Sequence, residues 1–298
     1  MKQYFSKLLL FGEYTIIQGG QALALPLERY SCHWTSIGTG AKSKPSLRRF
    51  YIFLKKLESQ KWLQGILDLK QFATDLKAGY FLESNIPIGY GLGSSGALCA
   101  AVYDRYAVAK INRDDEKNYA ELRHILGLME SYFHGSSSGV DPLICYLNQP
   151  VLIKPGAEIE RVSATLPPKT NKINFFLLDT QIPRKTGPLV EHFLQKCEDT
   201  AYAHRIKHEL IPQTEATITA FLQGRWPDLM IDMHSISLFQ WKYFREMIPE
   251  PFQTIWSKGL ESNDFKLKLC GAGGGGFLLG ITNNPSILPS FDTTIMML

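Results

Sequence analysis

The sequence predicts an α+β protein with two lobes. Three observations support this: short apolar runs broken by turn residues open the chain, segments of helical spacing follow as far as residue 133, and a buried-strand pattern at residues 173 to 180 precedes further long helical patterns. With 298 residues, 45% of them hydrophobic and 20% charged, the chain is long enough for one large domain or two fused lobes. The apolar run at 173 opens a second lobe, so we place the boundary at residues 165 to 166.

The first lobe is expected to begin as sheet. The runs KLLLFGEYTII, ALALPL and RYSCHWTSI fall within residues 7 to 38, and Gly12 and Gly19-Gly20 break them, which is typical of consecutive strands. Residues 39 to 49 contain Gly, Pro and four basic residues, so we expect a surface loop there.

Helices and one more strand are expected in the rest of this lobe. Apolar residues recur at helical spacing over residues 50 to 76, and AGYFLES indicates a strand. Small residues predict a helix over 97 to 109. Asp114 and Asp115 offer capping oxygens to a helix that ends near His134 and Gly135.

The second lobe is expected to open with the buried strand INFFLLDT. Helical patterns follow at about residues 187 to 222 and 226 to 247. The segment KLKLCGAGGGGFLLGIT then indicates a strand, a glycine loop and a strand.

Composition narrows the class of protein. The formal charge of +4 comes from 32 basic and 28 acidic residues that are interspersed, which suits a small anionic ligand and gives no argument for nucleic acid. The five cysteines include no C-x-x-C pair, so neither a disulfide framework nor a zinc site is indicated. Residues 8 to 11 are too short an apolar stretch for a signal peptide, and no run is long enough to span a membrane. We therefore expect a cytoplasmic protein.

The first chemical motif is PIGYGLGSS, residues 87 to 95, between an expected strand and an expected helix. Glycines at every second position let a backbone approach a ligand, and the N-terminus of the following helix attracts phosphate. Such a loop alone also serves as a packing turn. It matches neither the lysine-containing phosphate loop nor the dinucleotide fingerprint.

The second motif is CGAGGGG, in which five glycines in six residues lie between two apolar strands. Because glycine loses more backbone freedom on folding than any other residue, the cluster indicates that something approaches the backbone closely. A tight strand crossing without a ligand is the alternative.

Charged residues supply two further candidates. Glu130 and Asp141 stand at the two ends of ESYFHGSSSGVD, and such carboxylates can converge to hold Mg²⁺ and to accept a hydroxyl proton. As a bare pair they are more often unrelated surface residues. Lys7 enters an apolar strand, where an amine is rarely buried unpaired, so it is a candidate partner for Asp141 or a strand-end lysine that reaches solvent.

These segments, in this order, closely resemble the GHMP kinases, and within them the mevalonate kinase branch. PIGYGLGSS is similar to the family's phosphate loop and GAGGGG to its third motif. KLLLFGEY with ALALPL, E...HG...SGVD and DTQIPRKTGPLV are similar to the branch's opening, second acidic block and substrate-side segment. The resemblance implies an N-terminal ribosomal-protein-like βαβ lobe, a C-terminal ferredoxin-like lobe and an active site between them.

The resemblance also implies an activity and roles for single residues. It implies phosphoryl transfer from Mg-ATP to a small-molecule hydroxyl, with mevalonate as the leading acceptor, in a monomer or homodimer. Asp141 would be the catalytic base and Lys7 its partner, while Ser95 and Glu130 would bind Mg²⁺. Glu13, Tyr14 and Thr186 would lie on the substrate side. The residues implied for ATP are Gly89, Gly91, Leu92, Gly93, Ser94, Ser95, Gly271, Ala272, Gly273 and Gly274.

Three departures and several alternatives remain. Tyr14 stands where mevalonate kinases usually have His, Cys270 where Thr is common, and Ser137 where Pro is frequent. The change at Tyr14 leaves the acceptor open. The alternatives are a phosphomevalonate kinase, a sugar kinase and a non-catalytic ligand sensor of the same fold. Arg184 and Lys185 could supply the basic cluster that a phosphomevalonate kinase needs. A diphosphomevalonate decarboxylase fits the Lys7 opening less well.

Overall fold

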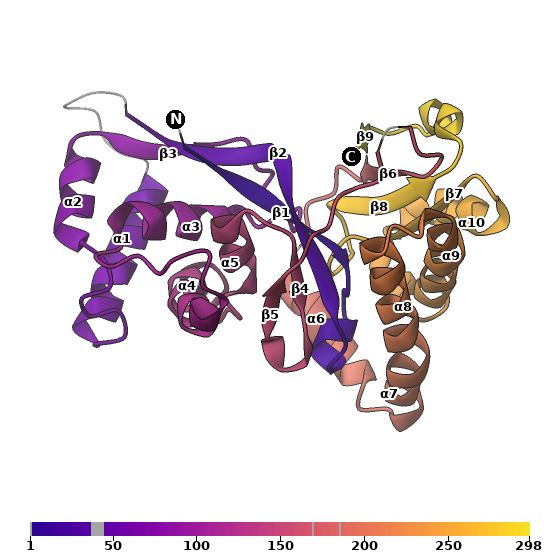
Figure 1. Ribbon diagram of the computed structural model, residues 1–298, viewed down its shortest axis with the longest axis horizontal. Helices are drawn as coiled ribbons and strands as arrows, with labels where there is room; N and C mark the ends of the chain where they lie inside the picture. Colours follow the sequence, from indigo (N-terminus) through magenta and orange to yellow (C-terminus); the bar gives the residue numbers. More distant parts are fainter. Residues whose placement is uncertain (1, 37–44, 169, 185) are drawn as a thin grey trace. The chain divides into compact units, whose positions relative to one another are not determined.

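The structure is a computed structural model that describes residues 2–36, 45–168, 170–184 and 186–298 (Figure 1). Its mixture of helices and antiparallel strands confirms the α+β class. The chain forms two compact units, each of which gathers segments that are distant in the sequence. Unit 1 comprises the segment ending at Lys7, Leu25–Pro87 and Leu92–Gln149, and unit 2 comprises Leu8–Ala24, Ile88–Gly91 and Pro150–Leu298. These units interleave along the chain, and a domain boundary at residue 165 stays a prediction.

Two long strands, β1 (Gln3–Phe11) and β2 (Ala22–Ser36), open the chain. The second and third apolar runs form one strand instead of two, because Glu28 between them and Arg29 after it continue the strand as exposed residues. The last part of the first run is not a strand either. Thr15–Gln18 forms a 3₁₀ turn, since positive φ angles at Gly12 (108°) and Tyr14 (66°) turn the backbone there.

Unit 1 continues with α1 (Pro45–Ser59), α2 (Leu69–Lys77) and β3 (Tyr80–Ser84), which pairs antiparallel with the end of β2. The helical spacing over residues 50 to 76 therefore covers two helices. The helical conformation is interrupted between them. Lys61 there has a positive φ, and the Asp68 side chain caps α2 by accepting from Gln71 N–H at 2.9 Å. Of the loop expected at 39 to 49, residues 39–44 lie outside the described residues and the remainder is helical.

Three helices complete unit 1: α3 (Ser94–Tyr106), α4 (Tyr119–His134) and α5 (Val140–Leu147). The expected end of α4 at His134 and Gly135 is confirmed, and Gly135 adopts a positive φ. Helices α3 and α5 pack closely because α3 presents Gly96, Ala97, Ala100 and Ala101, all of them buried. These small residues bring the N-terminal turns of the two helices together.

Unit 2 contains two antiparallel arrangements of strands. Residues Ala22 to Ala24 of β2 pair with β4 (Val151–Ile153), which pairs with β5 (Ile159–Arg161). A separate sheet has the order β7-β8-β6-β9 and is formed by β6 (Asn174–Asp179), β7 (Phe265–Leu269), β8 (Phe277–Thr282) and β9 (Ile295–Met297). The buried strand and the strand–glycine–strand segment are confirmed.

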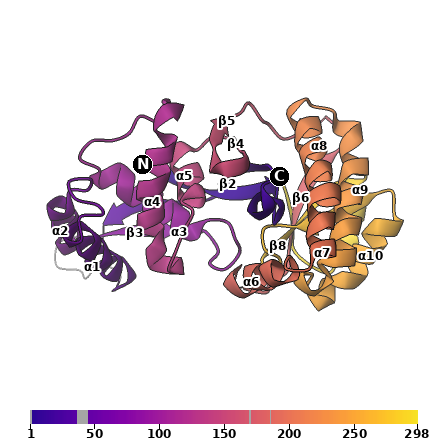
Figure 2. The same ribbon diagram turned by 90° about the horizontal axis from the view of Figure 1, so that it is seen from below.

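Helices of unit 2 accompany this sheet: α6 (Thr186–Lys196), α7 (Thr200–Arg205), α8 (Ile211–Leu222), α9 (Trp226–Tyr243) and α10 (Gln253–Glu261). In Figure 2, α8 and α9 run side by side, and α9 and α10 contact β7. Phe176, Leu267, Leu278 and Trp256 form part of the buried core. In the ranges that the structure describes, no helix combines the length and the hydropathy needed to cross a bilayer.

Candidate active site

The N-terminus of α3 is the first feature of the candidate site, in unit 1. Its N-cap is Gly93, whose φ of 73° lies in the left-handed region and which has no side chain to cap the helix. The first N–H groups of a helix have no partner within the helix and carry a partial positive charge. This helix end, the last part of the motif at residues 87 to 95, therefore has N–H groups that could bind an anion, and its role in binding phosphate stays a prediction.

Lys7 packs directly on this helix end. Its backbone N–H donates to the carbonyl of Leu92 at 3.0 Å, and a Cβ at Gly93 would lie only 3.0 Å from Lys7 Cγ. Lys7 Nζ lies 2.9 Å from Asp141 Oδ1, with 9% of the lysine side chain and 40% of the aspartate side chain exposed. The structure thus brings Lys7 and Asp141 together beside Gly93.

A second glycine positions Asp141. Asp141 lies in the first turn of α5, and a Cβ at Gly96 would meet Pro142 N at 2.9 Å and the carbonyl carbon of Asp141 at 3.0 Å. Real Cβ atoms essentially never approach so closely, so only glycine at position 96 allows α5 this contact with α3.

Glu130 and Ser95 also meet in unit 1. Ser95 Oγ donates to Glu130 Oε1 at 2.8 Å, and Ser137 Oγ donates to Glu130 Oε2 at 2.5 Å. Burial raises the pKa of Glu130 above its usual range, the Asp141 charge adds to this, and the two serine hydroxyls oppose it. The site therefore holds two carboxylates that interact electrostatically, one buried and one partly exposed.

His134 and Ser137 are contacts that the sequence reasoning missed. His134 Nε2 lies 3.2 Å from Ser95 Oγ. Because His134 follows Glu130 by four residues on one helix, the spacing could have placed both on one face of α4. Ser137 was noted only as a departure from the family pattern, yet it binds the Glu130 carboxylate.

In unit 2, Arg184 contacts glycines of both predicted glycine motifs. Its N–H donates to the carbonyl of Gly89 at 3.1 Å, and its guanidinium donates to the carbonyls of Cys270 at 2.5 Å and Gly275 at 3.5 Å. A Cβ at Gly91 would lie 1.6 Å from the guanidinium, and one at Gly271 would lie 2.6 Å from it. These two glycines make room for a protein side chain.

The glycine run, residues 271–276, forms hydrogen bonds with several segments of unit 2. Gly274 N–H donates to Met247 O at 2.6 Å and Gly276 N–H to Ile182 O at 2.7 Å. The hydroxyl of Tyr14 donates to Ala272 O at 2.7 Å. Tyr14 is buried between Phe193 and Phe244, with ring centroids at 4.6 and 5.1 Å. Its positive φ costs roughly 1–3 kcal/mol, which these contacts offset.

Glu13 is buried next to Tyr14 and pairs with a lysine that the sequence did not indicate. Lys268 Nζ lies 2.6 Å from Glu13 Oε1, with 1% and 3% of the two side chains exposed. Loss of one partner from such a pair costs about 3–5 kcal/mol, because the other charge stays buried. Thr186, the third residue expected on the substrate side, is exposed at the start of α6. The substrate roles of these residues stay predictions.

Comparison with known proteins finds a family model and a curated relative that match parts of this chain. Residues 56–149 match the family described as GHMP kinases N terminal domain. The mevalonate kinase of Arabidopsis thaliana is 23% identical over 219 residues, which cover 66% of this chain and 54% of the relative. The chain thus spans about half the length of the curated relative that it matches.

Solved structures share the fold over the full chain. The L. major mevalonate kinase in complex with R-mevalonate has a TM-score of 0.67 at 15% identity, covering 100% of this chain and 95% of that one. The Streptococcus pneumoniae phosphomevalonate kinase, in complex with phosphomevalonate and AMPPNP, has a TM-score of 0.67 at 13% identity, covering 100% and 99%.

The chain thus has the fold of these kinases, and residues 56–149 match the GHMP kinase N-terminal domain. Ser95, Glu130 and Asp141 lie within the matched range. Lys7 precedes that range, and the fold brings it to Asp141 in unit 1.

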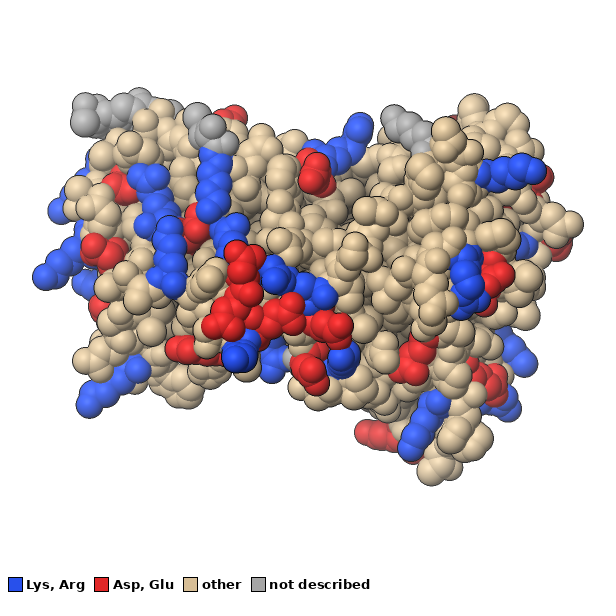
Figure 3. All heavy atoms as spheres, in the orientation of Figure 1, with Lys and Arg blue, Asp and Glu red and all other residues tan. Residues whose placement is uncertain are grey.

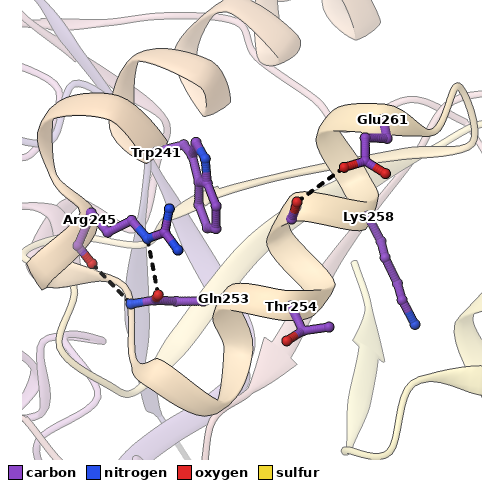
Figure 4. A pocket seen from close by; sticks show the side chains of 7 residues that line it. Trp241, Arg245, Gln253, Thr254, Lys258 and Glu261 are labelled. Atoms are coloured by element: carbon purple, nitrogen blue, oxygen red, sulfur yellow. Dashed lines mark hydrogen bonds between the residues drawn. The ribbon is translucent and has the colours of Figure 1, made fainter.

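A surface hollow of about 370 Å³ in unit 2 contains none of the predicted site residues (Figure 4). Arg245 covers the Trp241 ring at 3.6 Å, and its Nε donates to Gln253 Oε1 at 3.0 Å. Ser257 donates to Glu261, so most polar groups of the hollow are engaged with one another. On the face in Figure 3, acidic and basic side chains lie beside one another, as the interspersed charges of the sequence indicate.

Proposed function

We propose that this chain transfers the γ-phosphoryl group of ATP to a hydroxyl of mevalonate, giving 5-phosphomevalonate. The observation that carries the proposal is the 2.9 Å ion pair of Lys7 and Asp141, which Gly93 and Gly96 bring against the N-terminus of α3. Phosphoryl transfer depends on alignment and charge stabilisation more than on covalent chemistry. A carboxylate, a cation and a phosphate-binding helix end supply these needs.

Asp141 has the exposure and the partner that a base in this reaction requires. Its side chain is 40% exposed, so an acceptor hydroxyl can donate a hydrogen bond to it. As the acceptor oxygen bonds to phosphorus and the bond to the ADP oxygen breaks, the hydroxyl proton passes to the Asp141 carboxylate. Lys7 keeps this carboxylate oriented and stabilises the negative charge that develops beside it.

The residues present fit Mg²⁺ and ATP. Ser95 and Glu130 offer a hydroxyl and a carboxylate, the oxygen ligands that Mg²⁺ prefers, and a nearby cation would favour the ionised form of the buried Glu130. Bound there, Mg²⁺ would neutralise charge on the phosphate oxygens. The N–H groups at Ser94 and Ser95 would hold those oxygens. The glycine run is assigned to ATP from its resemblance to the family motif.

Arg184 favours an unphosphorylated acceptor. A kinase for a phosphorylated substrate needs cations free to bind that phosphate. The guanidinium of Arg184 instead donates to the carbonyls of Cys270 and Gly275. Lys185, its neighbour in the basic pair, lies outside the described residues. The mevalonate kinases among the similar proteins support the same acceptor.

The test is an ADP-release assay with Mg-ATP and a panel of mevalonate, phosphomevalonate, galactose and homoserine. We expect release that saturates with mevalonate alone. If ADP release saturates with another compound of the panel instead, that compound is the acceptor. If no compound gives ADP release from a protein that still binds ATP, the result contradicts the kinase proposal and favours a ligand sensor.

A further inference from the structure

Two consecutive residues, Glu13 and Tyr14, contact the segment of unit 2 that joins β7 to the glycine run. Glu13 contacts Lys268 and Tyr14 contacts Ala272. Glu13 reaches the end of β7, directly before the glycine run, through Lys268. Tyr14 reaches the run itself through Ala272 O. Both side chains are buried, with 5% of Glu13 and 3% of Tyr14 exposed.

The contact of Glu13 with β7 is a closed network. Lys268 Nζ donates to Glu13 Oε1 at 2.6 Å and to Leu269 O at 2.7 Å. Gln240 from α9 donates to the same Glu13 oxygen at 2.9 Å and accepts from Leu269 N–H at 2.8 Å. Both polar backbone groups of Leu269 are thus tied to Glu13 through one intermediate side chain each.

The other polar atoms of this pair also point away from solvent. Within the part of the chain that the structure describes, Glu13 Oε2 is buried and has no hydrogen-bond partner. The Tyr14 hydroxyl is used by Ala272 O, and its ring lies between Phe193 and Phe244. The Tyr14 hydroxyl and the Oε1 atom of Glu13 are therefore both engaged with protein groups of unit 2.

The glycine run depends on such contacts for its shape. Gly271, Gly273, Gly274 and Gly276 all have φ between 71° and 77°, and glycine has the largest backbone entropy to lose. A segment of this kind is ordered only if surrounding groups hold it. Glu13, through Lys268 and Gln240, holds Leu269 at the end of the strand that leads into the run, and Tyr14 holds Ala272, the second residue of the run.

We infer that Glu13 and Tyr14 are positioning residues of the glycine run, with Lys268 and Gln240 as the intermediates of Glu13, and that they act on the nucleotide side of the reaction. This differs from the acceptor role that their sequence positions imply. The inference rests on the proposed function in one respect, which is that the glycine run serves ATP.

Amide hydrogen exchange of residues 269 to 276 tests the positioning directly. Tyr14→Phe removes only the hydroxyl, and Lys268→Met removes the buried cation. Each should speed exchange in this segment about five- to tenfold, the effect of one lost hydrogen bond. Lys266→Met is the matched control, because Lys266 is the other buried lysine of β7 and donates to Gly259 and Ser262 instead. It should leave the segment unchanged.

A second comparison distinguishes a direct charge interaction from general loss of stability. Glu13→Gln in the Lys268→Met background removes the carboxylate charge that Lys268→Met leaves unpaired. The amide introduced at position 13 still has an oxygen that can accept from Gln240. Exchange protection in the double variant should therefore exceed that of Lys268→Met. Equal or lower protection would show that Lys268 does not act through Glu13.

Kinetics show on which substrate the two residues act. In Tyr14→Phe the KM for ATP should rise about fivefold, while the KM for the acceptor stays within about twofold. A raised acceptor KM with unchanged ATP KM and unchanged exchange would overturn the inference. If the wild type releases no ADP with any acceptor, the proposed function fails, whereas exchange with and without ATP still decides the positioning.

Discussion

Lys7 and Asp141 are joined by a 2.9 Å ion pair in which the lysine is buried and the carboxylate is partly exposed. The pair depends on two glycines. Gly93 accommodates the Lys7 side chain, and Gly96 accommodates the backbone of residues 141 and 142. The loop proposed to bind phosphate and the charged pair beside it therefore depend on the same short segment.

Removing the Asp141 charge tests the proposed chemistry. Asp141→Asn should lower kcat at least about a hundredfold, because the amide cannot take the hydroxyl proton, while ATP affinity stays nearly unchanged. Steady-state kinetics and nucleotide titration measure both. Asp228→Asn is the control, since Asp228 forms an exposed ion pair with Arg225 in α9 and should keep wild-type turnover. Normal turnover of Asp141→Asn would remove Asp141 from the mechanism.

Glu130 is expected to determine the dependence of the reaction on Mg²⁺. Glu130→Gln keeps an oxygen acceptor for one serine but loses the charge, so half-maximal activity should need about tenfold or more Mg²⁺. A magnesium titration at saturating ATP measures this. Glu121→Gln, an exposed substitution in the first turn of the same helix, should leave the titration unchanged. Identical curves for both variants would contradict a metal role of Glu130.

Local patterns predicted much of the fold, because they report local preferences. Apolar runs bounded by turn residues placed the opening strands and the buried strand at 174, and Gly135 marked the end of α4. Turns without a sequence signal were missed. Tyr14 has a positive φ that buried partners far along the chain support, so the sequence indicated a strand where the backbone turns.

The two glycine motifs were also predicted only in part from the sequence. Their spacing indicated a close approach to the backbone, and the structure shows that much of the approaching material is protein. Arg184 lies against Gly91 and Gly271, and Lys7 lies against Gly93. The Glu13 and Lys268 pair joins residues at opposite ends of the chain, which no periodicity reveals.

Asp104 gives unit 1 a pH-dependent contribution to stability. Burial opposes its ionisation, but Lys2, Tyr4 and Arg113 together lower the pKa of this carboxyl below its usual value of 3.8. A lowered pKa in the folded state stabilises the protein above the unfolded pKa, and this contribution is lost as pH falls through the folded value.

Asp104→Asn should therefore lower the free energy of unfolding by roughly 1.5–3 kcal/mol at pH 7, the value of hydrogen bonds to a charged group. The difference from wild type should shrink as pH falls below 3.8. Denaturant unfolding at both pH values measures it. If the stability difference between Asp104→Asn and the wild type did not change with pH, the Asp104 charge would not be its cause.

Gly96 provides the test of how the site is assembled. Gly96→Ala adds a Cβ that would lie 2.9 Å from Pro142 N, so α5 must move away from α3 and carry Asp141 with it. Overpacking of this kind costs about 1–3 kcal/mol of unfolding free energy, and it should lower kcat as well. Gly187→Ala is the control for stability, because a Cβ at Gly187 meets no atom within 4 Å. If Gly96→Ala kept both wild-type stability and wild-type kcat, the contact between α3 and α5 would not be what places the carboxylate.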